Sequence, residues 1–188
     1  MSEVAFYSEL RINTSQVNAD NYVGVDNLLP DKHGKVASCC VPTKGNLIEY
    51  RINDVLIGNI RPYLKKIWFA THDGGTNGDV LTIRIKEQSS ADLLPKYFYY
   101  LLASDDFFDY DTQYSKGAKM PRGDKTAVMK YSIPIPPLAE QERIVAILDK
   151  FSALANDLTQ GLPAEIEARR KQYEFYRDKL LTFKESAS

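Results

Sequence analysis

Residues 133–183 read IPIPPLAEQERIVAILDKFSALANDLTQGLPAEIEARRKQYEFYRDKLLTF, and this stretch decides how the carboxyl-terminal part of the chain folds. Its first residues include Pro134, Pro136 and Pro137. Proline has no backbone N–H and holds φ at about −65°, so it fits neither a helix interior nor a central strand. We therefore predict an extended exit from the preceding domain, after which a helix begins.

Apolar side chains in this stretch are separated by alternating steps of four and three residues, which aligns them on one face of an α-helix. The first series is Ile144, Leu148, Phe151, Ala155 and Leu158. After Gly161 a second series, with one arginine among its members, follows the same steps: Leu162, Ile166, Arg169, Tyr173, Tyr176, Leu180 and Phe183. Gly161 and Pro163 predict a break between two helices. The spacing leaves a kink and a hairpin both open, and we favour the kink.

The charges of this stretch are unevenly divided. Residues 138–167 carry six acidic and two basic side chains, whereas residues 168–184 carry six basic and two acidic ones. Two copies of the stretch bring unlike charges together only when they run antiparallel. We therefore predict an antiparallel homodimer, and its expected interface residues are Ile144, Leu148, Phe151, Leu158, Ile166, Arg169, Tyr173, Tyr176 and Leu180.

These residues resemble the conserved region of the specificity subunit of type I restriction-modification enzymes. The resemblance rests on features that occur together: the proline-rich run Ile133 to Leu138, the Glu140-Gln141 pair followed by Arg143-Ile144-Val145, and the basic aromatic run Gly161 to Leu181. It implies that a target recognition domain precedes the helix and that the chain corresponds to a half-subunit. The implied partners are double-stranded DNA, a methyltransferase subunit and, through the complex, a restriction subunit.

The composition is that of a globular protein. The chain has 188 residues, of which 44% are hydrophobic and 26% are charged, and its formal net charge is −1. This length allows one domain with a helical appendage. We expect an α+β fold, with a mixed α/β target recognition domain over residues 1–136 and a long, coiled-coil-like helical spacer over residues 137–188. Because the net charge is near zero, affinity for DNA has to come from local basic patches.

Two observations bear on the cellular setting. Cys39 and Cys40 are adjacent, an arrangement unsuited to an ordinary disulfide and short of the ligands that a metal site needs. No apolar run approaches the roughly 20 residues that cross a bilayer, and the first residues lack the apolar core of a signal peptide. We expect a soluble, cytoplasmic protein with no membrane partner.

Short apolar or alternating segments bounded by turn residues predict strands at residues 36–41, 46–52, 54–57, 67–70 and 80–85. Residues 95–108 have helical spacing, with Phe98, Leu101, Leu102 and Phe108 available for a buried face. The glycine-rich residues 71–79 are expected to form a flexible loop.

Two loops carry a local excess of positive charge and are the candidate DNA contacts. The first basic loop, residues 59–66, contributes Arg61, Tyr63, Lys65 and Lys66. The second basic loop, residues 114–125, contributes Lys116, Lys119, Arg122 and Lys125. Lysine and arginine supply charge-assisted donors to phosphate, and an arginine can bind guanine through two hydrogen bonds. Solvated surface loops remain the alternative for both segments.

The sequence carries no recognisable catalytic constellation. An adenine methyltransferase needs a cofactor loop and an Asn/Asp-Pro-Pro-aromatic motif, but Ile135 precedes the only adjacent prolines. His33 and His72 are isolated, and we interpret four acidic residues as solvated charges and helix caps: Asp105, Asp106, Asp109 and Asp111. We expect no cofactor, no metal and no catalysis by this chain. The alternative function is a protein–protein adaptor with a helical dimerisation arm.

Overall fold

Strand β5, Val55–Gly58, is buried on both faces and lies between two hydrophobic cores. Successive side chains of a strand point to opposite faces. Val55 and Ile57 accordingly belong to the larger core, whereas Leu56 belongs to a smaller core with Val23 and Tyr50. The continuous apolar run in the sequence therefore marks a strand that is covered on both sides.

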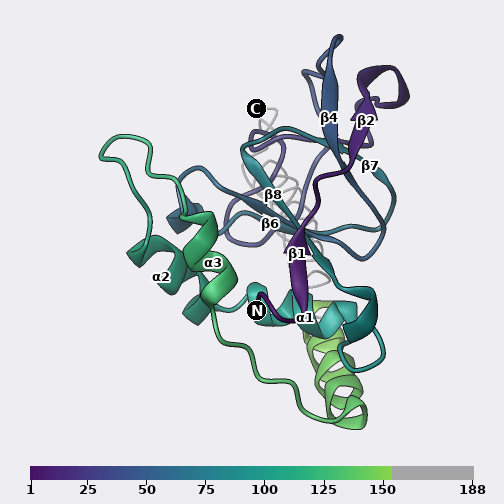
Figure 1. Ribbon diagram of the computed structural model, residues 1–188, viewed down its shortest axis with the longest axis vertical. Helices are drawn as coiled ribbons and strands as arrows, with labels where there is room; N and C mark the ends of the chain where they lie inside the picture. The colour runs from purple at the N-terminus through teal and green to yellow at the C-terminus, as the bar shows by residue number, and fades with distance from the viewer. Residues whose placement is uncertain (154–188) are drawn as a thin grey trace, which may run out of the picture. The chain divides into compact units, whose positions relative to one another are not determined.

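Strand β5 is part of one of two four-stranded sheets in the computed structural model, which describes residues 1–153 (Figure 1). The first sheet is fully antiparallel and has the order β1-β8-β5-β6, with β1 at Ala5–Tyr7, β6 at Ile67–Phe69 and β8 at Val80–Ile85. The second sheet has the order β2-β4-β7-β3, with β2 at Arg11–Asn13, β3 at Tyr22–Val23, β4 at Asn46–Tyr50 and β7 at Gly74–Thr76. Its β3–β7 pair is parallel.

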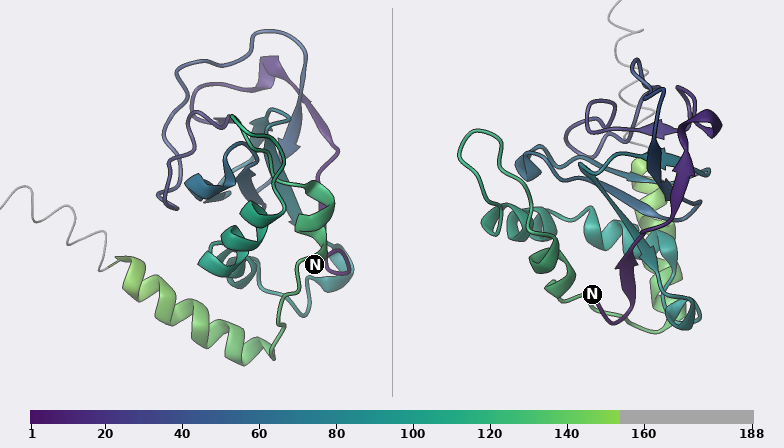
Figure 2. Two further views of the ribbon diagram at one scale, coloured as in Figure 1. Left: turned by 90° about the vertical axis from the view of Figure 1, so that its left-hand side faces the viewer. Right: turned by 45° about the horizontal axis from the view of Figure 1, so that its top comes forward.

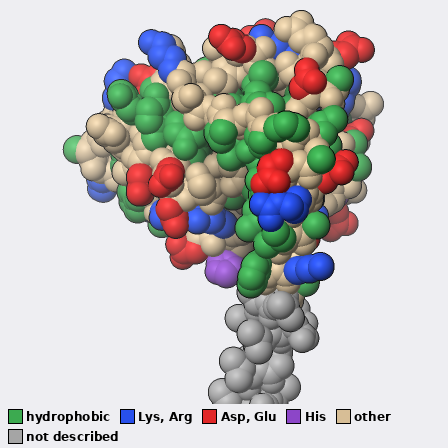
Figure 3. Space-filling view, turned by 90° about the horizontal axis from the view of Figure 1, so that it is seen from below, with side chains coloured by type: hydrophobic (Ala, Val, Ile, Leu, Met, Phe, Trp, Pro, Cys, Tyr) green, Lys and Arg blue, Asp and Glu red, His purple; other side chains and the backbone are tan. Residues whose placement is uncertain are grey.

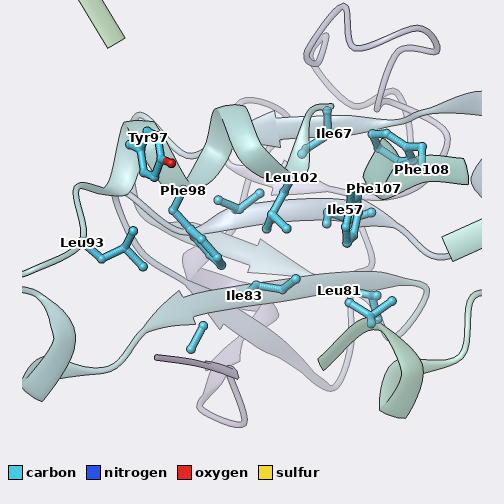
Figure 4. Packing of buried hydrophobic residues seen from close by; sticks show 13 residues of the cluster. Ile57, Ile67, Leu81, Ile83, Leu93, Tyr97, Phe98, Leu102, Phe107 and Phe108 are labelled. Carbon is cyan, nitrogen blue, oxygen red and sulfur yellow. The ribbon is translucent and has the colours of Figure 1, made fainter. Parts of the chain in front are cut away.

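Two α-helices supply most of the aromatic side chains of the larger core (Figure 4). Helix α1, Pro95–Leu102, begins with proline, which needs no hydrogen-bond partner in the first turn. Helix α2, Asp105–Gln113, is capped by Ser104, whose hydroxyl accepts a hydrogen bond from the backbone N–H of Phe107. The fully buried members of this core include Ile57, Ile67, Ile83, Leu93, Phe98, Leu102, Phe107 and Phe108.

The remaining helices are short. Helix α3, Lys125–Lys130, is capped by Asp124, which accepts hydrogen bonds from Thr126 N and Ala127 N. Single 3₁₀ turns occupy η1 (Thr14–Gln16), η2 (Pro62–Leu64) and η3 (Glu87–Ser89). The turn η2 falls inside the first basic loop, and α3 follows the second.

The structure confirms the α+β class and most of the predicted strands, including residues 80–85 with both ends in place. The strand predicted at residues 36–41 is wrong, because Val36 is instead hydrogen-bonded in both directions to Asn27. The predicted helix at residues 95–108 is two helices, α1 and α2, separated at the Ser104 cap.

The glycine-rich segment 71–79 is not simply a loop, since it contains β7. A side chain at Gly74 would collide with the carbonyl oxygen of Asn21 and the hydroxyl of Tyr50. Glycine is therefore needed there for close packing of a buried strand. The prediction of a flexible loop is therefore wrong for Gly74–Thr76.

The proline-rich exit is neither helix nor strand, and a helix runs from residue 138 to residue 153, where the described part of the chain ends. The chain divides after Val145 into two compact units, Met1–Val145 and Ala146–Ser188. The first two turns of the helix therefore belong to the globular unit. The domain boundary expected after residue 136 stays a prediction.

Gln141 connects the first turns of this helix to the rest of the globular unit through hydrogen bonds. Its side chain is completely buried. Its Oε1 accepts a hydrogen bond of 2.9 Å from Leu94 N, and its Nε2 donates to the carbonyl oxygens of Asp92 at 2.7 Å and Pro136 at 2.8 Å. The glutamine of the Glu-Gln pair thus satisfies three backbone groups at once.

Ile144 is partly buried against the larger core, whereas the Phe151 side chain is 65% exposed. The other expected interface residues from Leu158 onward, and the Gly161–Pro163 break, lie outside the described residues. The proposed interface and the choice between kink and hairpin stay predictions. Within residues 1–153, no helix combines the length and the apolar character needed to cross a membrane.

Candidate nucleic-acid interface

The two basic loops lie side by side and are joined through their backbones. Arg61 N donates to Pro121 O at 2.7 Å, and Gly123 N donates to Asn59 O at 3.1 Å. Lys116 and Arg122 exchange two hydrogen bonds of 2.9 Å, which close the base of the second loop. The structure therefore places both candidate DNA contacts on one surface.

In the first basic loop some side chains are exposed, and others are bound to atoms of the protein itself. Arg61 is exposed, and the Tyr63 side chain is 50% exposed. Lys65 Nζ lies 2.6 Å from Asp105 Oδ1. Lys66 Nζ donates to the carbonyl oxygen of Val25 at 2.6 Å, and burial lowers its pKa. Lys66 therefore points into the domain, a direction that counting charges could not predict.

The second basic loop protrudes between α2 and α3 (Figure 1), and Figure 2 shows η2 beside it. Residues 116–120 are all exposed. Lys116 forms an exposed ion pair of 2.7 Å with Asp124, and Arg122 forms one of 3.1 Å with Asp79. Exposed pairs of this kind are weak. Lys116, Arg122 and the exposed Lys119 can therefore turn toward an approaching phosphate at little cost.

Lys125 differs from the other predicted contacts because it lies in the first turn of α3. Its Nζ lies 6.0 Å from the centre of the Tyr7 ring, and the Tyr7 hydroxyl donates to the Lys125 carbonyl oxygen at 3.0 Å. Burial of Tyr7, with the nearby charges of Asp111 and Asp124, raises its pKa. Tyr7 therefore stays a neutral hydrogen-bond donor that ties β1 to α3.

A third segment, residues 30–35, joins this surface and was missed in the sequence analysis. Asp31 N donates to Leu64 O at 2.9 Å, and Lys32 N donates to Lys65 O at 3.0 Å. His33 is exposed, and Lys35 Nζ lies 5.1 Å from the centre of the Trp68 ring. The signal in the sequence was two lysines and a histidine within a glycine-containing turn, but Asp31 offsets part of the positive charge, so the segment is less basic than the two loops that were chosen.

Beneath the second basic loop lies a buried carboxyl group. The Asp111 side chain, only 1% exposed, has no hydrogen-bond partner for either oxygen within the described residues, and neither has Asn59 Oδ1. A Cβ on Gly123 would lie 2.5 Å from Asp111 Oδ1 and 2.9 Å from Asn59 Oδ1. Burial, reinforced by the charge of Asp124, raises the pKa of Asp111 to about 6. The interpretation of Asp111 as a solvated charge was therefore wrong.

A second face of the molecule has no comparable cluster of one charge. On the face shown in Figure 3, acidic, basic and hydrophobic side chains are interspersed. Within residues 1–153, no three His, Cys, Asp or Glu side chains are grouped so that they could hold a metal ion. The basic loops are therefore the feature of the described surface that best fits a polyanion.

The described residues thus form a mixed α+β domain with two neighbouring basic loops, and a helix follows its proline-rich exit. The sequence model of the type I restriction modification DNA specificity domain matches residues 46–168. The chain belongs to this family.

Proteins with similar sequences are also named as type I specificity subunits. The specificity subunit of the type I restriction enzyme EcoR124I/EcoR124II from Escherichia coli is 43% identical over 91 residues, which are 48% of this chain and 22% of that protein. A putative type I restriction enzyme specificity subunit from Haemophilus influenzae is 59% identical over 54 residues, 29% of this chain and 14% of that protein. The matched segments therefore cover less than a quarter of each of these relatives.

Solved structures show the same fold. The HsdS subunit from Thermoanaerobacter tengcongensis superposes with a TM-score of 0.61 at 23% identity, covering 96% of this chain and 45% of that subunit. The S subunit of a type I restriction-modification system from M. genitalium superposes with a TM-score of 0.57 at 16% identity, covering 98% of this chain and 45% of that one.

Proposed function

We propose that this chain recognises double-stranded DNA as the specificity component of a type I restriction-modification system. The observation that carries the proposal is the backbone pairing of the two basic loops, which gathers Arg61, Lys116, Lys119 and Arg122 on one surface. Family membership supports the same conclusion. In this role the chain reads DNA without catalysing a reaction, and a methyltransferase subunit supplies the methyl transfer. The adaptor alternative gains no support from the family.

The loops are tested by replacing Lys116, Lys119 and Arg122 with alanine. Each lost phosphate contact should reduce the slope of log affinity against log salt by about 1, so we expect a slope shallower by about 2 to 3 and at least tenfold weaker binding at low salt. The measurement is fluorescence anisotropy with a duplex of random sequence, over a range of salt concentrations.

The control is a variant in which Arg11, Lys44 and Lys130 are replaced with alanine. These residues are exposed outside the two basic loops, and their replacement removes the same amount of positive charge. It should bind DNA nearly as the wild type does, and both triple variants should keep the wild-type melting temperature. Equal losses in the two variants would mean that only net charge matters, and an unchanged loop variant would remove the second basic loop from the interface.

We further propose that two copies of the chain pair antiparallel through residues 137–188 and so present two identical domains to a gapped palindromic target. The support is the opposite charge of residues 138–167 and 168–184, with the apolar series of both segments. A restriction subunit would join through the methyltransferase complex. This assembly is a proposal from the sequence, because most of its residues lie outside the described part of the chain.

Charge reversal tests the antiparallel pairing. Changing Arg169, Arg170 and Lys171 to glutamate should place acidic residues opposite the acidic half of the partner, and so weaken the dimer by at least tenfold. Light scattering across protein concentration measures the dissociation. Reversal of Arg11, Lys44 and Lys130 is the matched control and should leave the dimer intact. A wild-type chain that stays monomeric at micromolar concentration, with and without DNA, would exclude the model.

A further inference from the structure

Two lysines from different loops converge on a single carboxylate oxygen. Lys32 Nζ lies 2.8 Å and Lys65 Nζ 2.6 Å from Oδ1 of Asp105. Hydrogen bonds from Lys32 and Lys65 lower the pKa of Asp105 to about 2, so this carboxylate is ionised at physiological pH. The cluster of Lys32, Lys65 and Asp105 therefore carries two positive charges and one negative charge, and it lies on the surface that includes the first basic loop.

The backbone that presents these lysines adopts an uncommon conformation. Among the described non-glycine residues, five have positive φ, and four of them belong to these two loops: Asp31, Lys32, Arg61 and Lys65. Side chains rarely tolerate such φ values, and residues that keep them concentrate at functional sites. The two hydrogen bonds between residues 31–32 and residues 64–65 hold the loops in this arrangement. The backbone positions of both lysines are therefore set by the fold.

Stability of the fold does not account for this arrangement. The Asp105 side chain is 65% exposed, and exposed ion pairs contribute little to stability. A carboxylate and a phosphate are both oxyanions that accept charge-assisted hydrogen bonds from ammonium groups. Asp105 thus occupies the position that a phosphate oxygen would take between Lys32 and Lys65.

We propose that Lys32 and Lys65 form a contact for a DNA backbone phosphate and that Asp105 is its internal competitor. The inference rests on the proposed DNA-binding function and identifies a residue that opposes it. Phosphate contacts carry no base sequence information, so Asp105 weakens binding to DNA of every sequence. It thereby increases the share of affinity that has to come from base contacts made by the protruding second loop.

The test is Asp105→Asn, with Asp106→Asn as its control. Both residues are exposed acids in the first turn of α2, but only Asp105 holds the two lysines. For a duplex of random sequence at low salt, we expect Asp105→Asn to tighten binding roughly threefold to tenfold and to steepen the salt slope by about 1 to 2. Asp106→Asn should change affinity only slightly. Adding Lys32→Ala and Lys65→Ala to Asp105→Asn should remove the gain.

Equal gains from Asp105→Asn and Asp106→Asn, or a gain that survives loss of both lysines, would overturn the inference while leaving the proposed function standing. A wild-type chain without affinity for DNA would refute the proposed function instead. Inorganic tripolyphosphate, with its binding followed by NMR of the lysine side chains, then tests this site alone. Tighter binding by Asp105→Asn than by Asp106→Asn supports the site, and equal binding rejects it.

Discussion

Replacing Gln141 with leucine is expected to lower the free energy of unfolding of the globular unit by about 3 kcal/mol, because Leu94 N–H and the carbonyl oxygens of Asp92 and Pro136 lose their buried partner. For a unit of this size the melting temperature should fall by roughly 6 to 12 °C. Leucine is close to glutamine in volume, so the loss should come from the unsatisfied backbone groups and not from a cavity.

Differential scanning calorimetry measures the effect, and Gln113→Leu is the control. Gln113 is exposed at the end of α2, so the same chemical change there should leave the melting temperature within about 2 °C of the wild type. If Gln141→Leu also melts within that range, the three hydrogen bonds do not fasten the helix to the domain.

Replacing Asp111 with asparagine is expected to stabilise the protein at pH 8 and not at pH 4. The pKa of Asp111 is about 6 in the folded protein, against an ordinary value of 3.8. A raised carboxyl pKa means that the folded state binds the proton more tightly than the unfolded state does. The wild type should therefore lose up to about 3 kcal/mol from this group as the pH rises from about 4 to above 6.

An asparagine at position 111 carries no charge. The variant should escape the pH-dependent loss, and urea unfolding at several pH values measures the difference. Asp109→Asn, on the exposed face of the same helix, should keep the wild-type pH dependence. A variant at position 111 that is less stable than the wild type at pH 8 would show that the ionised carboxylate has a partner that stabilises it.

The sequence predicted those parts of the fold that depend on local pattern. The strand at residues 80–85 and the start of a helix after the proline-rich exit are visible as periodicity and proline placement. Strand β7 could not be predicted, since its glycines are needed only because Asn21 and Tyr50 pack against Gly74. The strand predicted at residues 36–41 was wrong for a similar reason, because hydrogen bonds with Asn27 hold Val36 in a loop.

The sequence located the two basic loops but not the arrangement of their side chains. Local charge identified both basic loops, but the sequence could not show that they are joined or that Lys66 turns toward Val25. It also gave no sign that Asp105 is shared by two lysines, because those partners are 73 and 40 positions away. Such long-range pairings depend on the folded backbone.

The hydrogen bonds that join the two basic loops run between main-chain atoms, which every residue type except proline can supply in full. Residues 116–120 are all exposed, and the ion pair of Lys116 with Asp124 is of the weak, exposed kind. Under the proposed function, we expect amino acid changes there to alter which bases are contacted while the loop keeps its shape. The second basic loop is thus a natural position for a randomised library, from which variants with new target sequences could be selected on an unchanged scaffold.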